Sequence, residues 1–245
     1  MVLEKADIEY FECRGRDETP KFWTRLGGYP SLERMRVLDV GCGHGNLCVD
    51  IASRGADMVL GIDINKRLIE FAKENISQNY PQLKNIRFEH HDTSSIYKNE
   101  FDIIVSKDSF EHILKPDDVL RDIKQGLKDG GKAYIGFGPL YNSPYGDHKR
   151  TEAGYPWGHL ITPESSLIKK LNERHGKNID NVYDLDLNKL SLSEYKRLFR
   201  ESGLNILYFR VNVSNNTISK MFSLMVHIPF LKEYFSHNIY CILEK

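Results

Sequence analysis

The chain has 245 residues, and its 34 Lys and Arg residues are balanced by 34 Asp and Glu residues. With zero net charge there is no basic surplus of the kind that binds a nucleic-acid backbone, and no stretch approaches the roughly 18 apolar residues of a membrane span. The length suits one α/β domain with an insertion, which is large enough to bury a proper core.

Residues 1–34 precede the first predicted strand and mix charged with aromatic side chains. The aromatic residues of interest are Tyr10, Phe11, Phe22, Trp23 and Tyr29. An edge helix that packs Phe22 and Trp23 against a sheet would account for the two most apolar of them.

The next segment joins an apolar strand to a glycine-rich loop. Residues 36–40 are strand-like, Gly41, Gly43 and Gly45 follow at alternate positions, and a helical stretch runs from Asn46 to Arg54. Glycines let the backbone turn sharply and let a ligand approach the main chain, while the N–H groups that open the helix face that ligand. The third glycine comes one residue earlier than in a dinucleotide fingerprint, so the spacing predicts a nucleotide-cofactor loop but disfavours an NAD enzyme.

The following predicted strands end in polar residues. The strand over 57–62 ends at Asp63, about twenty residues past the glycine loop, where a carboxylate can accept both hydroxyls of a ribose. A third strand, 86–90, precedes Asp92 and Thr93. The apolar run 101–106 is typical of a parallel strand covered on both faces. A helical stretch to Leu127, a turn at Gly130 and Gly131 and a fifth strand over 132–138 complete this part of the chain.

The pattern Asp39-x-Gly41-x-Gly43-x-Gly45 resembles the first motif of the class I S-adenosylmethionine (SAM) dependent methyltransferases of the small-molecule type, and residues 35–138 keep the order of that family. The resemblance implies an α/β fold with a seven-stranded, mostly parallel Rossmann-like sheet, helices on both faces and an insertion or lid after strand five. It also implies SAM as the cofactor and S-adenosylhomocysteine as the product.

The resemblance also assigns a cofactor site. The glycine loop would wrap the methionine part of SAM, Asp39 would orient its ammonium group, and Asp92 would meet the adenine amino group. The full set of expected cofactor-binding residues is Asp39, Gly41, Cys42, Gly43, Gly45, Asp63, Ile64, Asp92, Thr93 and Lys107.

Four segments are predicted along the chain. Residues 1–34 form an N-terminal helical cap, which in members of the family often closes over the cofactor. The edge helix described above is the alternative interpretation of this segment. Residues 35–138 form the SAM-binding core, 139–190 form an acceptor lid, and 191–245 complete the core with a helical insert at 214–230. The apolar face of that insert is expected to pack on the lid or to mediate a homodimer rather than to lie on a membrane.

The later elements are predicted from their capping residues and apolar periodicity. A helix over Pro163–Glu173 follows Thr162 as its N-cap, and an amphipathic helix over Leu192–Ser202 is stopped by Gly203. Strands are expected over 204–213 and 237–244.

The acceptor is expected beyond the carboxyl ends of strands four and five, because ligands of open α/β sheets bind there. The aromatic-rich insertion is therefore well placed to cover it, and its composition suits a small-molecule pocket. The residues expected to contact the acceptor are Asp108, Phe110, Tyr141, Tyr145, Tyr155 and Trp157.

Histidine is the natural general base near neutral pH, and three histidines are candidates. His148 and His159 lie among the aromatic residues of the lid. Each could act as the base, or could form a hydrogen bond that orders the lid. His112 follows strand four, where it could instead orient the backbone. No metal is expected, because neighbouring strand residues such as His90 and His91 point to opposite faces. If the acceptor is a diol, Asp147, His148 and His159 could bind a metal ion.

The sequence therefore predicts a SAM-dependent methyltransferase that methylates a small, polar, hydroxylated acceptor, most simply on oxygen, by in-line transfer. The alternatives are a protein or nucleic-acid methyltransferase and a non-catalytic SAM-binding subunit. A DNA amino-methyltransferase would carry an Asn/Asp-Pro-Pro-Tyr/Phe motif after strand four, where this chain has Lys107-Asp108-Ser109-Phe110. Four scattered cysteines and the absence of a signal-peptide pattern near Met1 predict a cytoplasmic protein that binds no membrane.

Overall fold

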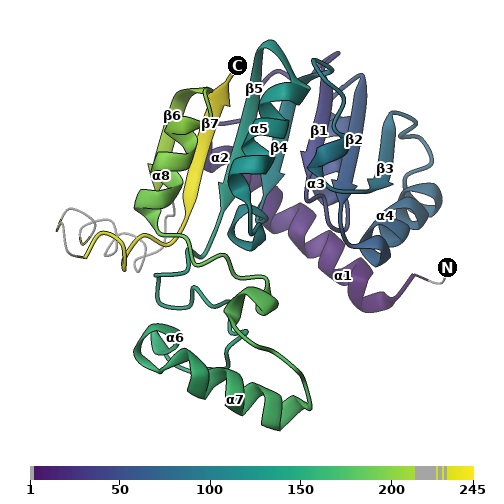
Figure 1. Cartoon of the computed structure of the whole chain (residues 1–245). Coiled ribbons are helices and arrows are strands. Elements are labelled where there is room, and N and C mark those ends of the chain that lie inside the picture. The colour runs from purple at the N-terminus through teal and green to yellow at the C-terminus, as the bar shows by residue number, and fades with distance from the viewer. Residues whose placement is uncertain (1–2, 213–224, 226–227, 229–230) are drawn as a thin grey trace.

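The computed structural model describes residues 3–212, 225, 228 and 231–245 (Figure 1). The predicted helical insert at 214–230, and with it the expected dimer surface, lies outside the described residues except for positions 225 and 228. Among the helices that the structure describes, none combines the length and the apolar composition that crossing a bilayer requires.

A seven-stranded sheet with the order β3-β2-β1-β4-β5-β7-β6 forms the centre of the molecule. Strands β1 to β5 pair in parallel, and β7 runs antiparallel between β5 and β6. This confirms the predicted fold class. The strands are β1 Arg36–Val40, β2 Met58–Asp63, β3 Ile86–His90, β4 Phe101–Lys107, β5 Leu127–Phe137, β6 Asn205–Val211 and β7 Ile239–Glu244.

Helices cover both faces of the sheet because successive side chains of the buried strands point to opposite sides. In β1, for example, Leu38 belongs to one apolar cluster and Val37 to the other. The first cluster takes in side chains of α5 and α8, and the second takes in side chains of α2, α3 and α4. The helices of these two layers are α2 Thr19–Arg25, α3 Asn46–Ser53, α4 Lys66–Asn79, α5 Pro116–Gly126 and α8 Leu192–Glu201.

Two predicted boundaries were wrong. Strand β5 begins at Leu127, which pairs with Phe101, so Gly130 and Gly131 lie within the strand, and the register shifts between Phe101 and Ile103. Helix α7 (Glu164–His175) has Pro163 at its N-cap and no side-chain cap. Thr162 does not cap it, since its hydroxyl lies 2.9 Å from the Tyr155 hydroxyl.

The N-terminal segment packs on the sheet and also passes below it. Helix α2 buries Phe22 and Trp23 completely, and the Trp23 ring meets Tyr134 of β5 edge-on at 5.9 Å. Helix α1 (Lys5–Cys13) crosses beneath the carboxyl ends of the parallel strands, and a π-helical turn (Arg14–Glu18) joins it to α2 (Figure 1). Helix α2 is thus the expected edge helix, whereas closure of residues 1–34 over a cofactor stays a prediction.

The chain leaves the sheet after β5 and builds a separate layer below it (Figure 1). This layer contains α6 (Gly158–Ile161), α7 and a 3₁₀ turn at Val182–Leu185. It has an apolar cluster of its own, made of Tyr141, Ile168, Leu171, Ile179, Val182 and Leu187. We call residues 139–190 the lid.

We predict that Gly45→Ala destabilises the fold more than Gly27→Ala does. Both glycines have positive φ, +83° and +96°, but a Cβ at 45 would lie 2.7 Å from the Phe88 ring, whereas a Cβ at 27 would meet nothing within 4 Å. Overpacking costs about 1–3 kcal/mol beyond the shared backbone strain. Urea unfolding of both variants measures the difference, and equal losses would show that Phe88 does not restrict position 45.

Candidate active site

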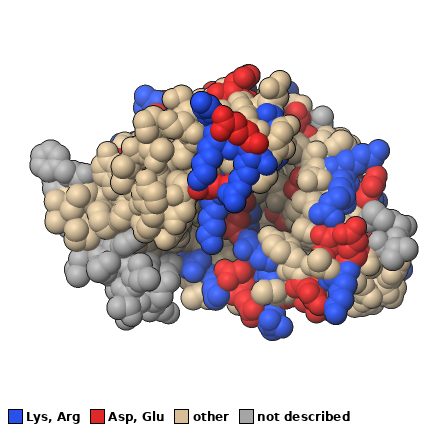
Figure 2. Space-filling model, turned by 90° about the horizontal axis from the view of Figure 1, so that it is seen from below, with Lys and Arg blue, Asp and Glu red and all other residues tan. Residues whose placement is uncertain are grey.

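A cavity of about 1000 Å³ opens at the carboxyl ends of β1, β2 and β4. Its walls come from the glycine loop, the ends of these strands, the first turn of α4, α1 and the lid. Figure 2 shows Lys, Arg, Asp and Glu side chains of both signs gathered around a hollow on this side of the molecule. The volume is at the upper end of the ~300–1,000 Å³ range of small-molecule sites, so it suits a cofactor together with a small second ligand.

The three glycines of the loop are required for three different reasons. At Gly41 a Cβ would lie 2.3 Å from the Ser109 hydroxyl oxygen, so this position lets β1 and the end of β4 approach each other. Gly43 has φ +52° and nothing within 4 Å of its Cβ direction, so its main chain borders open space. Gly45 packs against Phe88 and does not line the cavity. Only the first two glycines therefore border the cavity.

Two carboxylates lie beside the loop in different environments. Asp63 is accessible, and its two oxygens accept hydrogen bonds from the N–H groups of Gly43 (2.9 Å) and Asn65 (2.8 Å). Asp39 is buried beneath the loop, where its carboxylate lies 3.3 Å from the Cys48 sulfur. Burial raises the pKa of Asp39 to about 7, and the Cys48 hydrogen bond opposes that rise.

Nine of the ten expected cofactor residues line the cavity, and Gly45 is the exception. Asp92 accepts a hydrogen bond from the N–H of Ser94 (3.0 Å), and the Thr93 hydroxyl donates to Asp122 (2.7 Å). Lys107 lies at the end of β4, where burial lowers its pKa.

Helix α1 and the π-helical turn contribute residues that the sequence reasoning missed. Tyr10 and Arg14 line the cavity, and Arg14 forms an ion pair with Asp108, which also lies 3.2 Å from the Lys107 ammonium. Asp7 accepts hydrogen bonds from His44 of the glycine loop (2.9 Å) and from Arg67 of α4 (2.6 Å). Nothing in the sequence pattern indicated these pairs, because they join residues far apart in the chain.

Most of the aromatic residues expected to contact the acceptor lie elsewhere. Asp108 lines the cavity with φ +54°, whereas Phe110 is fully buried against Phe137. Tyr141 belongs to the lid cluster, Tyr145 and Tyr155 are exposed, and the Trp157 N–H donates to the Tyr234 carbonyl. The lid residues that do line the cavity are Arg150 and Asp186.

The three candidate histidines occupy different positions. His112 lines the cavity, and burial lowers its pKa. His148 lies outside the cavity lining, 3.1 Å from the Pro139 carbonyl oxygen, and burial, with His112 close by, lowers its pKa to about 4. His159 is only 4% exposed and lies 2.6 Å from the Tyr141 carbonyl oxygen and 3.8 Å from Asp147, inside the lid. The structure therefore does not bring His159 to the cavity.

Residues 31–139 match a family profile described as "Methyltransferase domain". Over these residues the chain is similar to that family, and as a whole it shares the Rossmann-like fold of solved SAM-dependent methyltransferases. The methyltransferase profile covers β1 to β5 and the glycine loop, which is the part of the chain that forms most of the cavity. SAM is the cofactor of this class.

Two curated relatives show how far the sequence likeness extends. The ubiquinone biosynthesis O-methyltransferase of Coxiella burnetii is 35% identical to this chain over 107 residues. These residues are 43% of this chain and 44% of the Coxiella burnetii protein. The ribosomal protein L11 methyltransferase of Dictyoglomus thermophilum is 38% identical over 99 residues, 40% of this chain and 31% of that protein. The chain thus matches less than half the length of these curated relatives.

The fold extends further than the sequence likeness does. A SAM-dependent methyltransferase structure from Mesorhizobium loti superposes with a TM-score of 0.60 at 16% identity and covers 92% of this chain and 96% of that one. At this identity the comparison shows that the two methyltransferases share a fold.

We predict that Asp63→Ala weakens SAM binding by more than about 1.5 kcal/mol, a loss of at least about tenfold in affinity. The change removes charge-assisted hydrogen bonds to the ribose and also the acceptor for the Gly43 N–H. Asp57→Ala, just before the other end of the same strand, is the matched control. Calorimetric titration with SAM measures both, and unchanged affinity of the Asp63 variant would contradict the assignment of this carboxylate.

We predict that Asp39→Asn stabilises the ligand-free protein more at pH 8 than at pH 5. The pKa of Asp39 is about 7 when folded and about 3.8 when unfolded, so the wild type loses stability as the pH rises from about 4 to about 7. Asparagine does not titrate, and the gain at pH 8 should therefore exceed that at pH 5 by an amount on the order of 2 kcal/mol. Urea unfolding at both pH values measures it, and a pH-independent difference would contradict the burial of an ionisable carboxyl.

Proposed function

We propose that this methyltransferase transfers the methyl group of SAM to a hydroxyl oxygen of a small, polar acceptor. The observation that carries the proposal is one cavity lined by two chemically different groups of residues, which we call its two ends. The glycine loop, Asp39 and Asp63 border one end. Asp108, His112 and the lid residues Arg150 and Asp186 border the other.

The first end suits SAM in its chemistry. Gly43 presents main chain with no Cβ in the way, which suits close approach of the methionine part. The Asp39 carboxylate suits the ammonium group, the remaining lone pairs of Asp63 suit the ribose hydroxyls, and Asp92 suits the adenine amino group. Tyr10 of α1 and Arg14 of the π-helical turn also line the cavity, and the Arg14 guanidinium lies over the Tyr10 ring.

The second end suits an acceptor with several hydroxyls. Arg150 offers N–H donors, and Asp108 and Asp186 offer carboxylate acceptors, while Ile113 and Leu114 add apolar walls. In the reaction the acceptor oxygen attacks the methyl carbon, the carbon–sulfur bond breaks, and S-adenosylhomocysteine leaves as a neutral thioether. The acceptor proton passes to solvent or to a base. Holding the two reactants in line can contribute roughly 7–11 kcal/mol.

The relatives support oxygen as the acceptor atom. The Coxiella burnetii protein is named a ubiquinone biosynthesis O-methyltransferase. The Dictyoglomus thermophilum protein is named for a protein substrate, which is the alternative to be tested.

The test is transfer of label from methyl-labelled SAM into a native cell extract, which is then fractionated by size. We expect label in the small-molecule fraction, from which the acceptor can be isolated. Label confined to protein or nucleic acid would overturn the small-molecule proposal, and no transfer to any fraction would favour a non-catalytic SAM-binding protein.

We predict that Arg150→Leu lowers the methylation rate of the labelled acceptor at least about tenfold while SAM affinity stays unchanged. Arg150 lines the acceptor end of the cavity, and a lost charged hydrogen bond costs about 1.5–3 kcal/mol. Arg174→Leu is the matched control on the same lid, since Arg174 pairs with Glu152 outside the cavity lining. Equal rates for the two variants would show that Arg150 does not contact the acceptor.

A further inference from the structure

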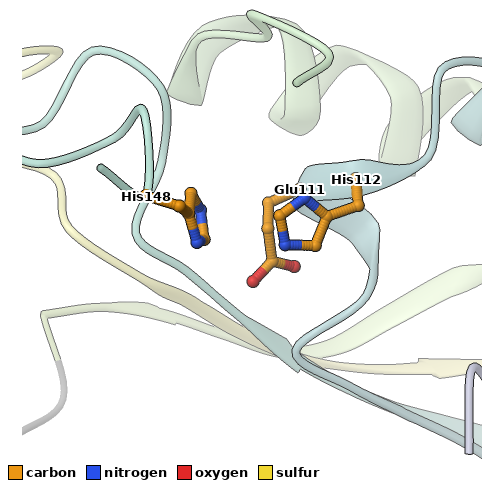
Figure 3. A group of neighbouring side chains, drawn as sticks. All are labelled: Glu111, His112 and His148. Atoms are coloured by element: carbon orange, nitrogen blue, oxygen red, sulfur yellow. The ribbon is translucent and has the colours of Figure 1, made fainter. Parts of the chain in front are cut away.

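Three side chains that could ligate a metal ion meet where the lid lies beside the turn that follows β4. Glu111 and His112 belong to a 3₁₀ turn (Phe110–His112), and His148 belongs to the lid. One potential ligand atom from each lies within 4.8 Å of the other two. Figure 3 shows the two imidazole rings and the carboxyl group turned toward a common space.

The carboxyl group of Glu111 has an oxygen without a partner. Glu111 is 5% exposed, its Oε1 accepts a hydrogen bond from the Gly138 N–H (3.2 Å), and its Oε2 has no hydrogen bond. A buried polar oxygen without a partner is costly, and no donor among the described residues bonds to Glu111 Oε2. A cation among the three side chains would supply that partner.

Both histidines are held with one ring nitrogen free. The Nδ1 of His112 lies 2.8 Å from the Asp186 carbonyl oxygen, and the Nε2 of His148 lies 3.1 Å from that of Pro139. A carbonyl oxygen only accepts, so each of these nitrogens carries the proton. The other nitrogen, Nε2 of His112 and Nδ1 of His148, then presents a lone pair. Backbone carbonyls orient metal-bound histidines in the same way.

We propose that Glu111, His112 and His148 bind a divalent transition-metal ion of the Zn²⁺ kind. Two imidazole nitrogens and one carboxylate oxygen are a ligand set of zinc and iron sites, whereas calcium and magnesium prefer oxygen alone. The sequence predicted no metal and would have grouped His148 with Asp147 and His159. In the structure Asp147 instead bonds Thr151 within the lid.

The position of the site suggests what the ion would do. His112 also lines the acceptor end of the cavity, and three protein ligands leave at least one coordination position free. An acceptor hydroxyl bound there would lose its proton more readily, which would remove the need for a histidine base. This role rests on the proposed function, whereas the binding site itself does not.

The experiment is a calorimetric titration of the full chain with ZnCl₂ at pH 7, after dialysis against a chelator. We expect one ion per chain for the wild type, and at least about tenfold weaker binding for Glu111→Gln and for His148→Ala. The matched control is His175→Gln, because His175 also contacts a glutamate, Glu152, but on the exposed surface. Glutamine at 111 keeps the shape of the side chain, and thermal unfolding without metal checks that each variant is folded.

The outcomes separate this proposal from the proposed function. Failure of the wild type to bind Zn²⁺ would overturn the metal site. Binding as tight as that of the wild type by both the Glu111 and the His148 variants would overturn it too. A loss of binding in the His175 variant alone would do the same and would place the ion on the surface. Titration of the same samples with SAM tests the cofactor end independently, so a protein that binds SAM but no Zn²⁺ would keep the methyltransferase assignment and lose the metal.

Discussion

The carboxylate of Asp63 ties the end of β2 to the loop that follows β1, and the cavity depends on that attachment. One oxygen accepts the Gly43 N–H and the other accepts the Asn65 N–H, while the N–H groups of Gly41 and Cys42 donate to the Ile62 carbonyl. Strands β1 and β2 pair in parallel, with Val40 beside Ile62, so both ends of the attachment lie on one rigid edge. The loop that borders the cavity is therefore held by the sheet itself.

Those parts of the fold that depend on local pattern could be predicted from the sequence. The bounds of the first and third strands agreed with the structure, because buried parallel strands are short apolar runs that end in turn residues. Nine of the ten expected cofactor residues line the cavity because the carboxyl ends of parallel strands converge. Gly45 was placed with them only because it shares the motif, and the sequence does not show that Phe88 packs on it.

The rest of the site depends on tertiary placement, which leaves no local signal. Arg14 meets Asp108 across 94 positions of sequence, and Glu111 meets His148 only because the lid folds back on the end of β4. The lid aromatics were expected in the pocket because large apolar side chains suit either a pocket or a core. Tyr141 joined the core of the lid, and the polar residues Arg150 and Asp186 line the cavity instead.

The lid has an apolar core that is distinct from the cores of the sheet. All six buried members of this cluster lie within residues 139–190, and the lid also contributes the buried Leu140 to one cluster of the sheet. A unit with its own core can change in sequence or length with little disturbance of its neighbours. The segment between β5 and α8 can therefore be exchanged or change in length while the parallel strands and the glycine loop remain as they are.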